Sequence, residues 1–178
     1  MKWKCVGLSF ALFLGGCVGV PQNVKPVDGF CAKNYLGHWC EIARLDHTFE
    51  RGLTQVTAEY RLRDDGGLDV LNRGYSEKDK VWKEAAGKAY FVHGSDQGYL
   101  KVSFFGPFYG SYVIFGLDRE QYRYSLVCGP NKSCLWILAR EPKMDQGLRT
   151  RLVAEAAALG FDVSKLIYSD APPSGRTD

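Results

Sequence analysis

Eight short strand-like runs at regular spacing, with turn residues between them, restrict this chain to an all-β fold. The clearest turn is Arg63-Asp64-Asp65-Gly66-Gly67, which predicts a hairpin between the second and third runs. The predicted strands are 37–45, 53–62, 68–75, a stretch within 81–92, 100–105, 111–117, 122–128 and 133–140. Eight antiparallel strands joined in sequence predict an eight-stranded antiparallel up-and-down β-barrel that can hold one small ligand.

After the last strand, the apolar residues recur at helical rather than strand spacing. This change predicts one C-terminal α-helix within 145–159, packed with its apolar stripe on the outside of the barrel. The residues at helical spacing are Leu148, Leu152, Ala156 and Leu159. We therefore expect a single folded domain over 30–170, with a mobile tail over 171–178 that contains two prolines and a glycine.

The first residues have the pattern of a lipoprotein signal peptide, which we assign to 1–16. Lys2 and Lys4 precede an apolar run that is too short for a permanent membrane span, and Leu14-Gly15-Gly16-Cys17 follows it. Small residues before a cysteine are typical of acylation at that thiol, with Cys17 as the new N-terminus; an ordinary secretory peptide is the alternative. Residues 17–29 are then the lipidated N-terminus and a tether, and no transmembrane helix is needed for anchoring.

The residue after the acylated cysteine indicates the destination. Val18 is not the aspartate that retains lipoproteins in the inner membrane, so we expect lipid anchoring in the outer membrane of a Gram-negative bacterium, facing the periplasm. Without Lys2 and Lys4, the 23 basic residues fall to 21 against 20 acidic ones. This balance argues against a nucleic-acid partner.

The first strand predicts how the barrel closes at its base. Period-two alternation places Trp39, Glu41, Ala43 and Leu45 on one face. A buried glutamate needs a basic partner, and Arg140 at the end of the last strand is the candidate. We expect Arg140 to stack on Trp39 and to pair with Glu41, with Gly37 at the strand entrance, as the structural base of the barrel.

The same alternation predicts which residues face the ligand. Tyr112 and Asn72 are the polar groups expected to touch a head group, within an otherwise apolar lining. The predicted ligand-binding residues are Val56, Ala58, Val70, Asn72, Val102, Phe104, Tyr112, Ile114, Leu126, Trp136 and Leu138. The connections at the open end carry His47, Phe49, Phe108 and Tyr109, which form either an aromatic lip that admits an acyl chain or a plug that fills the barrel.

Four cysteines remain once Cys5 leaves with the signal peptide and Cys17 is acylated. Exported proteins favour disulfides, and only one pairing avoids crossing the length of the barrel. We predict Cys31–Cys40 near the closed end and Cys128–Cys134 at the open end.

The histidines and the lack of catalytic motifs indicate a protein that is not an enzyme. His38, His47 and His93 have no metal-ligand spacing, so no metal and no cofactor are expected. His47, beside Asp46, is expected in a solvated loop. No nucleophile elbow or phosphate loop is present in the sequence.

At several positions the sequence resembles the lipocalins. Gly37-His38-Trp39 stands at the Gly-x-Trp motif of the family, Leu117-Asp118-Arg119-Glu120 at its middle turn, and Arg140 at its late arginine. The segments 41–52 and 101–110, together with the signal peptide, are similar to bacterial lipocalins that are outer-membrane lipoproteins.

This resemblance implies a ligand and a role. It implies binding, storage or transport of fatty acids or lysophospholipids in envelope maintenance. A homodimer around a shared ligand stays open. Two alternatives also stay open: a cysteine-dependent lipid isomerase using Cys134, and an envelope interaction module with a filled barrel.

Overall fold

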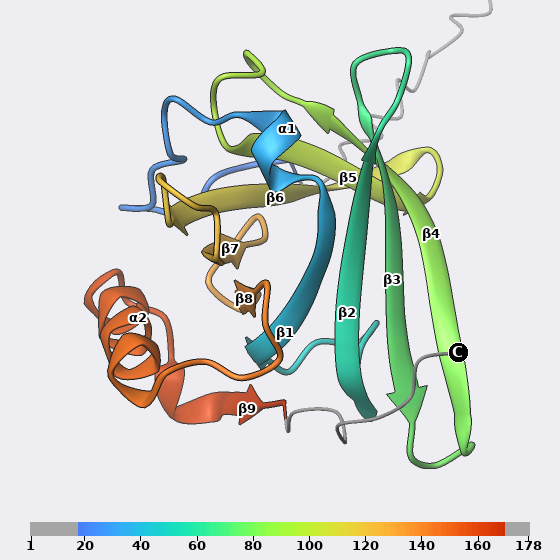
Figure 1. Ribbon diagram of the computed structural model, residues 1–178, viewed down its shortest axis with the longest axis vertical. Coiled ribbons are helices and arrows are strands. Elements are labelled where there is room, and N and C mark those ends of the chain that lie inside the picture. The colour runs from blue at the N-terminus through green and yellow to red at the C-terminus, as the bar shows by residue number, and fades with distance from the viewer. Residues whose placement is uncertain (1–17, 170–178) are drawn as a thin grey trace, which may run out of the picture.

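The computed structural model, which describes residues 18–169, shows a closed barrel of eight strands with one long helix on its outer surface (Figure 1). The strands are β1 (Gly37–Leu45), β2 (Leu53–Leu62), β3 (Leu68–Ser76), β4 (Val81–Phe91), β5 (Tyr99–Phe105), β6 (Phe108–Leu117), β7 (Tyr124–Cys128) and β8 (Leu135–Ala139). Each pairs antiparallel with the next, and β1 pairs with both β8 and β2. The predicted all-β, up-and-down barrel is confirmed.

The last two barrel strands begin later than predicted, because turns occupy their first residues. Tyr122 has φ 53° and donates its N–H to the carbonyl of Asp118. The N–H of Cys134 likewise points to the carbonyl of Asn131. These residues belong to turns, so β7 begins at Tyr124 and β8 at Leu135.

The predicted C-terminal helix is α2 (Gln146–Ala158), and it packs on the outside of the barrel as expected. Asp145 caps its first turn by accepting the N–H of Leu148 at 2.9 Å. Leu152 and Ala156 are buried in a cluster with outward-facing residues of the sheet. No helix in the described part of the chain is long and apolar enough to cross a membrane.

Three short elements were not predicted. Helix α1 (Ala32–Tyr35) precedes the first strand, and the 3₁₀ turn η1 (Val163–Lys165) leads into β9 (Leu166–Tyr168). Strands β1 and β2 pair only from Gly37 to Cys40, after which β9 pairs with Ala43–Leu45. Strand β9 therefore takes the place of β2 as the neighbour of β1 in the part of the sheet where β1 and β2 separate.

A β-bulge in β1 changes which residues face inward. The register with β8 shifts between Glu41 and Ala43, so Ile42 and Ala43 both pack in the outer cluster with α2. Arg44 then lies opposite Trp136. The prediction that side chains alternate strictly between the two faces of this strand was therefore wrong. Ala43 and Leu45 pack on the side of the sheet that faces α2, and Glu41 shares a face with Arg44.

Part of the predicted tether packs against the barrel. Val24 and Val27 are buried, and the N–H of Val27 donates to the carbonyl of Ile114 at 2.8 Å. From about residue 20 onward this segment is part of the folded domain. The signal peptide 1–16, the acylation of Cys17 and the tail 171–178 lie outside the described residues.

Candidate ligand site

The inward face of the barrel is apolar and becomes more accessible from the base towards the open end. On β5, Leu100 is buried, whereas Val102 and Phe104 are only partly buried. On β8, burial likewise decreases towards the open end, from buried Leu138 to partly buried Trp136. Exposure of the lining therefore increases from the base towards the open end, as expected for a pocket with a floor.

Most predicted lining residues lie on this inward face. Val70, Ile114 and Leu138 are buried in the interior cluster, and Ala58, Val102, Phe104, Tyr112 and Trp136 pack against it. Asn72 lies opposite Ala58 and Ala85 in the register, and Val56 is buried. The structure thus places most of these residues on the inner wall, and their contact with a ligand stays a prediction.

Leu126 was wrongly predicted to face the ligand. It packs in the outer cluster with α2, and Val127 takes the inward position. The β6–β7 register shifts between Ile114 and Gly116, and Leu126 lies across from Gly116. A Cβ on Gly116 would lie 2.8 Å from Leu126, so the missing side chain makes room for it. The one sequence signal for this bulge is Gly116, because a glycine inside a strand often marks such an irregularity.

The base of the barrel is sealed by Trp39 and Arg140. The Trp39 side chain is fully buried, and the Arg140 guanidinium lies 4.0 Å from its ring centroid, as predicted. Arg140 does not pair with Glu41. It donates instead to the backbone carbonyls of His38, Asn34 and Tyr122 at 2.7–3.1 Å.

Gly37 completes the base. It has φ 87°, a backbone conformation that residues with a side chain rarely adopt. A Cβ at this position would lie 3.7 Å from Arg140 Nη1. Gly37, Trp39 and Arg140 therefore form the base of the barrel, as predicted. The charge of the Arg140 guanidinium is satisfied there by backbone carbonyl oxygens.

Above the base, three tyrosine hydroxyls form a hydrogen-bonded chain. Tyr60 donates to Tyr112 at 2.7 Å, Tyr112 and Tyr35 are 2.8 Å apart, and Tyr35 donates to Ser125 at 3.3 Å. Burial raises the pKa of Tyr35 to about 12, and burial also raises the pKa values of Tyr60 and Tyr112. The floor of the pocket is therefore polar but uncharged. Of these three tyrosines, only Tyr112 was predicted from the sequence to face the ligand.

A buried ion pair lies in the wall nearer the open end. Arg44 Nη1 donates to Glu41 Oε1 at 2.5 Å, and Ser169 Oγ donates to the same oxygen at 2.7 Å. Burial, followed by the charge of Glu50, raises the pKa of Glu41 to about 7. Glu41 Oε2 and Arg44 Nε have no partner. Only the bulge in β1 brings these two residues together.

His47 is buried close to this ion pair, so the prediction that it lies in a solvated loop was wrong. It is 7% exposed, and its Nε2 lies 3.0 Å from Glu50 Oε2. The indole N–H of Trp136 donates to the same oxygen at 3.0 Å. Burial opposes charge on Glu50, but His47, Trp136 and Arg44 outweigh it and hold the pKa of Glu50 below its usual value.

The aromatic residues of the open end do not all fold inward. Phe49 is 67% exposed and Phe108 is 64% exposed, so neither fills the barrel, whereas Tyr109 is partly buried. Of the four residues predicted at the open end, only His47 is buried. These positions favour a lip over a plug.

All four cysteines in the described residues are free thiols, so the predicted disulfides are not present in the structure. Burial raises the pKa of Cys128 to about 12, and burial also raises the pKa of Cys40. Neither thiol is suited to act as a nucleophile at neutral pH. Cys134, the candidate for an isomerase, is partly exposed, and Cys31 is exposed.

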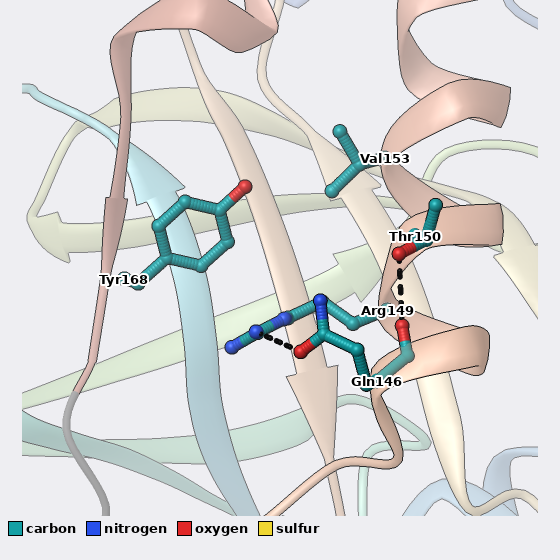
Figure 2. Close-up of a pocket in the computed structure, with 5 residues that line it drawn as sticks. All are labelled: Gln146, Arg149, Thr150, Val153 and Tyr168. Carbon is teal, nitrogen blue, oxygen red and sulfur yellow. Dashed lines mark hydrogen bonds between the residues drawn. The ribbon is translucent and has the colours of Figure 1, made fainter.

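A separate depression of about 480 Å³ lies outside the barrel, between α2 and β9. Figure 2 shows Tyr168 facing Arg149 and Gln146 across it, and Arg149 lies 5.2 Å from the centroid of the Tyr168 ring. Thr150 Oγ1 donates to the carbonyl of Gln146 at 2.9 Å. The polar side chains here bond to one another, so this depression is a surface feature of the helix packing.

A closed eight-stranded barrel with an apolar interior, a sealed base and one accessible end defines a small-ligand-binding barrel. Sequence comparison narrows this class. Residues 30–171 match the model of the lipocalin-like domain. The chain therefore belongs to the lipocalin family.

The similar proteins agree with this assignment. The chain is 61% identical over 158 residues to the outer membrane lipoprotein Blc of Vibrio cholerae serotype O1, covering 89% of this chain and 92% of that protein. It is 53% identical over 154 residues to the outer membrane lipoprotein Blc of Escherichia coli K12, covering 86% of each. Among solved structures, insecticyanin from Manduca sexta has a TM-score of 0.69 at 23% identity, covering 88% of this chain and 89% of that one, and supports the fold.

Proposed function

We propose that this protein binds a single-chain lipid, a fatty acid or lysophospholipid, in the barrel and stores or transports it for envelope maintenance. The observation that carries the proposal is the inward face: it is mostly apolar, buried at the floor and more exposed towards the open end. An acyl chain inserted there would be held by surface removed from water, at roughly 25 cal/mol per Å².

The polar groups of the pocket suggest where each end of the ligand lies. The floor carries the tyrosine chain, which is uncharged, so it suits an acyl terminus better than a carboxylate or phosphate. Asn72 Oδ1 is buried without a partner on the inward face, nearer the open end. We assign Asn72 to the head group, and expect Tyr112 to meet the chain rather than the head group.

The proposed location is the outer membrane, facing the periplasm. Two observations support it: the relatives are named outer membrane lipoproteins, and residues 1–17 have the pattern of a lipoprotein signal peptide with Cys17 as the acylated residue. Acyl chains on Cys17 would anchor the domain without a transmembrane helix.

Native mass spectrometry and Trp136 fluorescence test ligand binding. Protein purified without detergent is expected to carry, or to take up, one lipid per barrel or per dimer, with a saturable change in Trp136 emission. The two matched variants are Ala85→Phe and Ala86→Phe. Both alanines are exposed on the same strand, but Ala85 is paired with Asn72 and faces inward, whereas Ala86 faces outward.

Ala85→Phe should therefore weaken lipid binding, and Ala86→Phe should leave it unchanged. If no lipid is detected bound to the wild-type protein, or if the two variants behave alike, the barrel is not the binding site.

A further inference from the structure

Large apolar side chains are exposed at the open end of the barrel. Phe105 is 79% exposed, Phe49 67%, Phe108 64% and Trp82 44%. We call these four residues the aromatic rim. Phe105 and Phe108 face each other across the tip of the β5–β6 hairpin. In a monomer in water, such a set of exposed rings is unfavourable unless something covers it.

The rim is assembled from three separate connections. Phe49 lies between β1 and β2, Trp82 follows the β3–β4 turn, and the phenylalanine pair belongs to the β5–β6 hairpin. In an up-and-down barrel, alternate connections lie at the same end, so all three belong to the open end. Burial within the lining decreases towards this same end.

Most charges beside the rim are paired with an opposite charge. Lys80 pairs with Glu77 at 3.0 Å, and Lys83 pairs with Asp79 at 2.5 Å, all in or next to the β3–β4 turn. The β5–β6 tip, residues 105–108, has no charged residue. The rim is thus aromatic and close to neutral, as suits the interface of a phospholipid bilayer, where aromatic rings are favoured.

The course of the N-terminal segment indicates which surface covers the rim. The N–H of Gly19 donates to Ser111 Oγ at 2.7 Å, whereas Val27 bonds to Ile114 and Phe30 to Asp96. Strand β6 runs from Phe108 at the rim towards the base, so the segment begins on the rim side and ends at the base. Ser111 is only three residues from Phe108, roughly 10 Å along a strand.

We infer that the aromatic rim inserts into the phospholipid surface to which the chain is anchored, so that the mouth of the barrel faces the bilayer. The inference rests on the proposed anchoring at Cys17, which is two residues before Gly19. An acyl chain bound at Cys17 holds this end of the barrel, and not the base, next to the membrane. A lipid can then move between the leaflet and the barrel without crossing water.

The closed end differs and would not insert. Its hairpin 63–67 carries Arg63, Asp64 and Asp65, and the ion pair between Arg63 and Asp65 is 2.9 Å long. Leu62, 50% exposed beside that hairpin, stands apart from the rim. It provides a control position of similar exposure at the opposite end.

Quenching by brominated lipid tests this orientation. Full-length protein, matured and lipidated in cells, is reconstituted into vesicles of phosphatidylethanolamine and phosphatidylglycerol containing dibrominated phosphatidylcholine. Phe108→Trp and Leu62→Trp each add one indole, whose signal is measured against the wild type. We expect bromine to quench most of the signal added by Phe108→Trp and to leave that of Leu62→Trp intact.

Three results would overturn the inference. Equal quenching of the two variants would mean no preferred orientation, and quenching of Leu62→Trp alone would mean the opposite one. No quenching of either, with Phe108→Trp emission depending on protein concentration, would show that a second copy covers the rim.

The inference and the proposed function can fail separately. Ala85→Phe should weaken lipid binding in the barrel but leave the quenching of Phe108→Trp unchanged. Mass spectrometry of the same sample shows whether acyl chains are attached. Protein without acyl chains contradicts the proposed anchor, whatever the behaviour of the rim.

Discussion

The two ends of the barrel use arginine in opposite ways. At the base, Arg140 covers Trp39 from the partly exposed side and donates to three backbone carbonyls. Towards the mouth, Arg44 is 2% exposed and pairs with Glu41, and both partners keep a buried polar atom without a hydrogen bond. The base satisfies its polar groups and excludes water, whereas the mouth contains charged groups with incomplete hydrogen bonding beside a more exposed lining.

This contrast indicates a division between stability and function. Groups that are fully paired and packed contribute to stability, and incompletely satisfied groups are expected where a ligand or a conformational change is accommodated. Substitutions at the base should therefore act on folding, and those at the mouth on pH dependence and on binding.

The largest expected effect is at the base. Trp39→Ala removes a fully buried indole, the ring stacked on Arg140 and the hydrogen bond from its N–H to the carbonyl of Tyr35. We expect a loss of about 3 to 5 kcal/mol in the free energy of unfolding, measured by urea denaturation. Trp82→Ala, at an exposed position, should cost less than about 1 kcal/mol. Similar losses in the two variants would show that the base is not the stability centre.

The next effect tests the buried ion pair. Arg44→Met leaves Glu41 buried without its cation and should cost about 3 kcal/mol, again by urea denaturation. The double variant Glu41→Gln with Arg44→Met should recover part of this loss, because no unpaired charge remains. Arg51→Met breaks the exposed pair with Asp46 and is the control, with an expected change below about 0.5 kcal/mol. A double variant as unstable as Arg44→Met alone would argue against charge burial as the cause.

A smaller effect is expected from pH. The pKa of Glu41 is raised to about 7 in the folded state, from an ordinary value of 4.5. Between these values the folded protein holds a proton that the unfolded chain has lost, so stability should fall as pH rises through this window and level off above it. The change should be no more than about 3 kcal/mol, the full effect of this shift.

Glu41→Gln should flatten this dependence, as followed by unfolding at a series of pH values. Glu50 does not obscure it, because its pKa is lowered and its contribution is lost only as pH falls below the ordinary value. A wild-type profile that rises between these pH values would contradict the assignment.

The smallest expected effect concerns the floor. Tyr60→Phe removes the donor to Tyr112 but leaves the link between Tyr112 and Tyr35. We expect a loss of about 1 kcal/mol in stability, because one neutral buried hydrogen bond is removed. Tyr75→Phe, on the outward face near Trp82, is the control and should be close to neutral. A much larger loss would mean that the three hydroxyls act as one cooperative network.

Much of the fold was predictable because it depends on local patterns. The bounds of β1 and β2 were predicted to the residue, and helical spacing predicted α2. Pairing of the first and last strands followed from their residue types, so the stacking of Arg140 on Trp39 was also predicted correctly.

The errors share one physical cause. The side-chain period of a strand is two, so a single bulge exchanges the faces of all residues beyond it. The bulge in β1 paired Glu41 with Arg44 instead of Arg140, and the one between β6 and β7 moved Leu126 from the pocket to the helix side. The bulge in β1 has no feature in the sequence that distinguishes it from a regular strand, and the one between β6 and β7 is indicated only by Gly116.

The sequence alone therefore determined the class of fold, the order of its strands, the outer helix, the sealed base and the apolar character of the interior, since these follow from periodicity and residue type. Only the tertiary structure decided the buried cluster of Glu41, Arg44, His47 and Glu50, the tyrosine chain of the floor, and the course of residues 18–30 from the rim to the base. These depend on register shifts and on contacts between residues far apart in the chain, which no local pattern records.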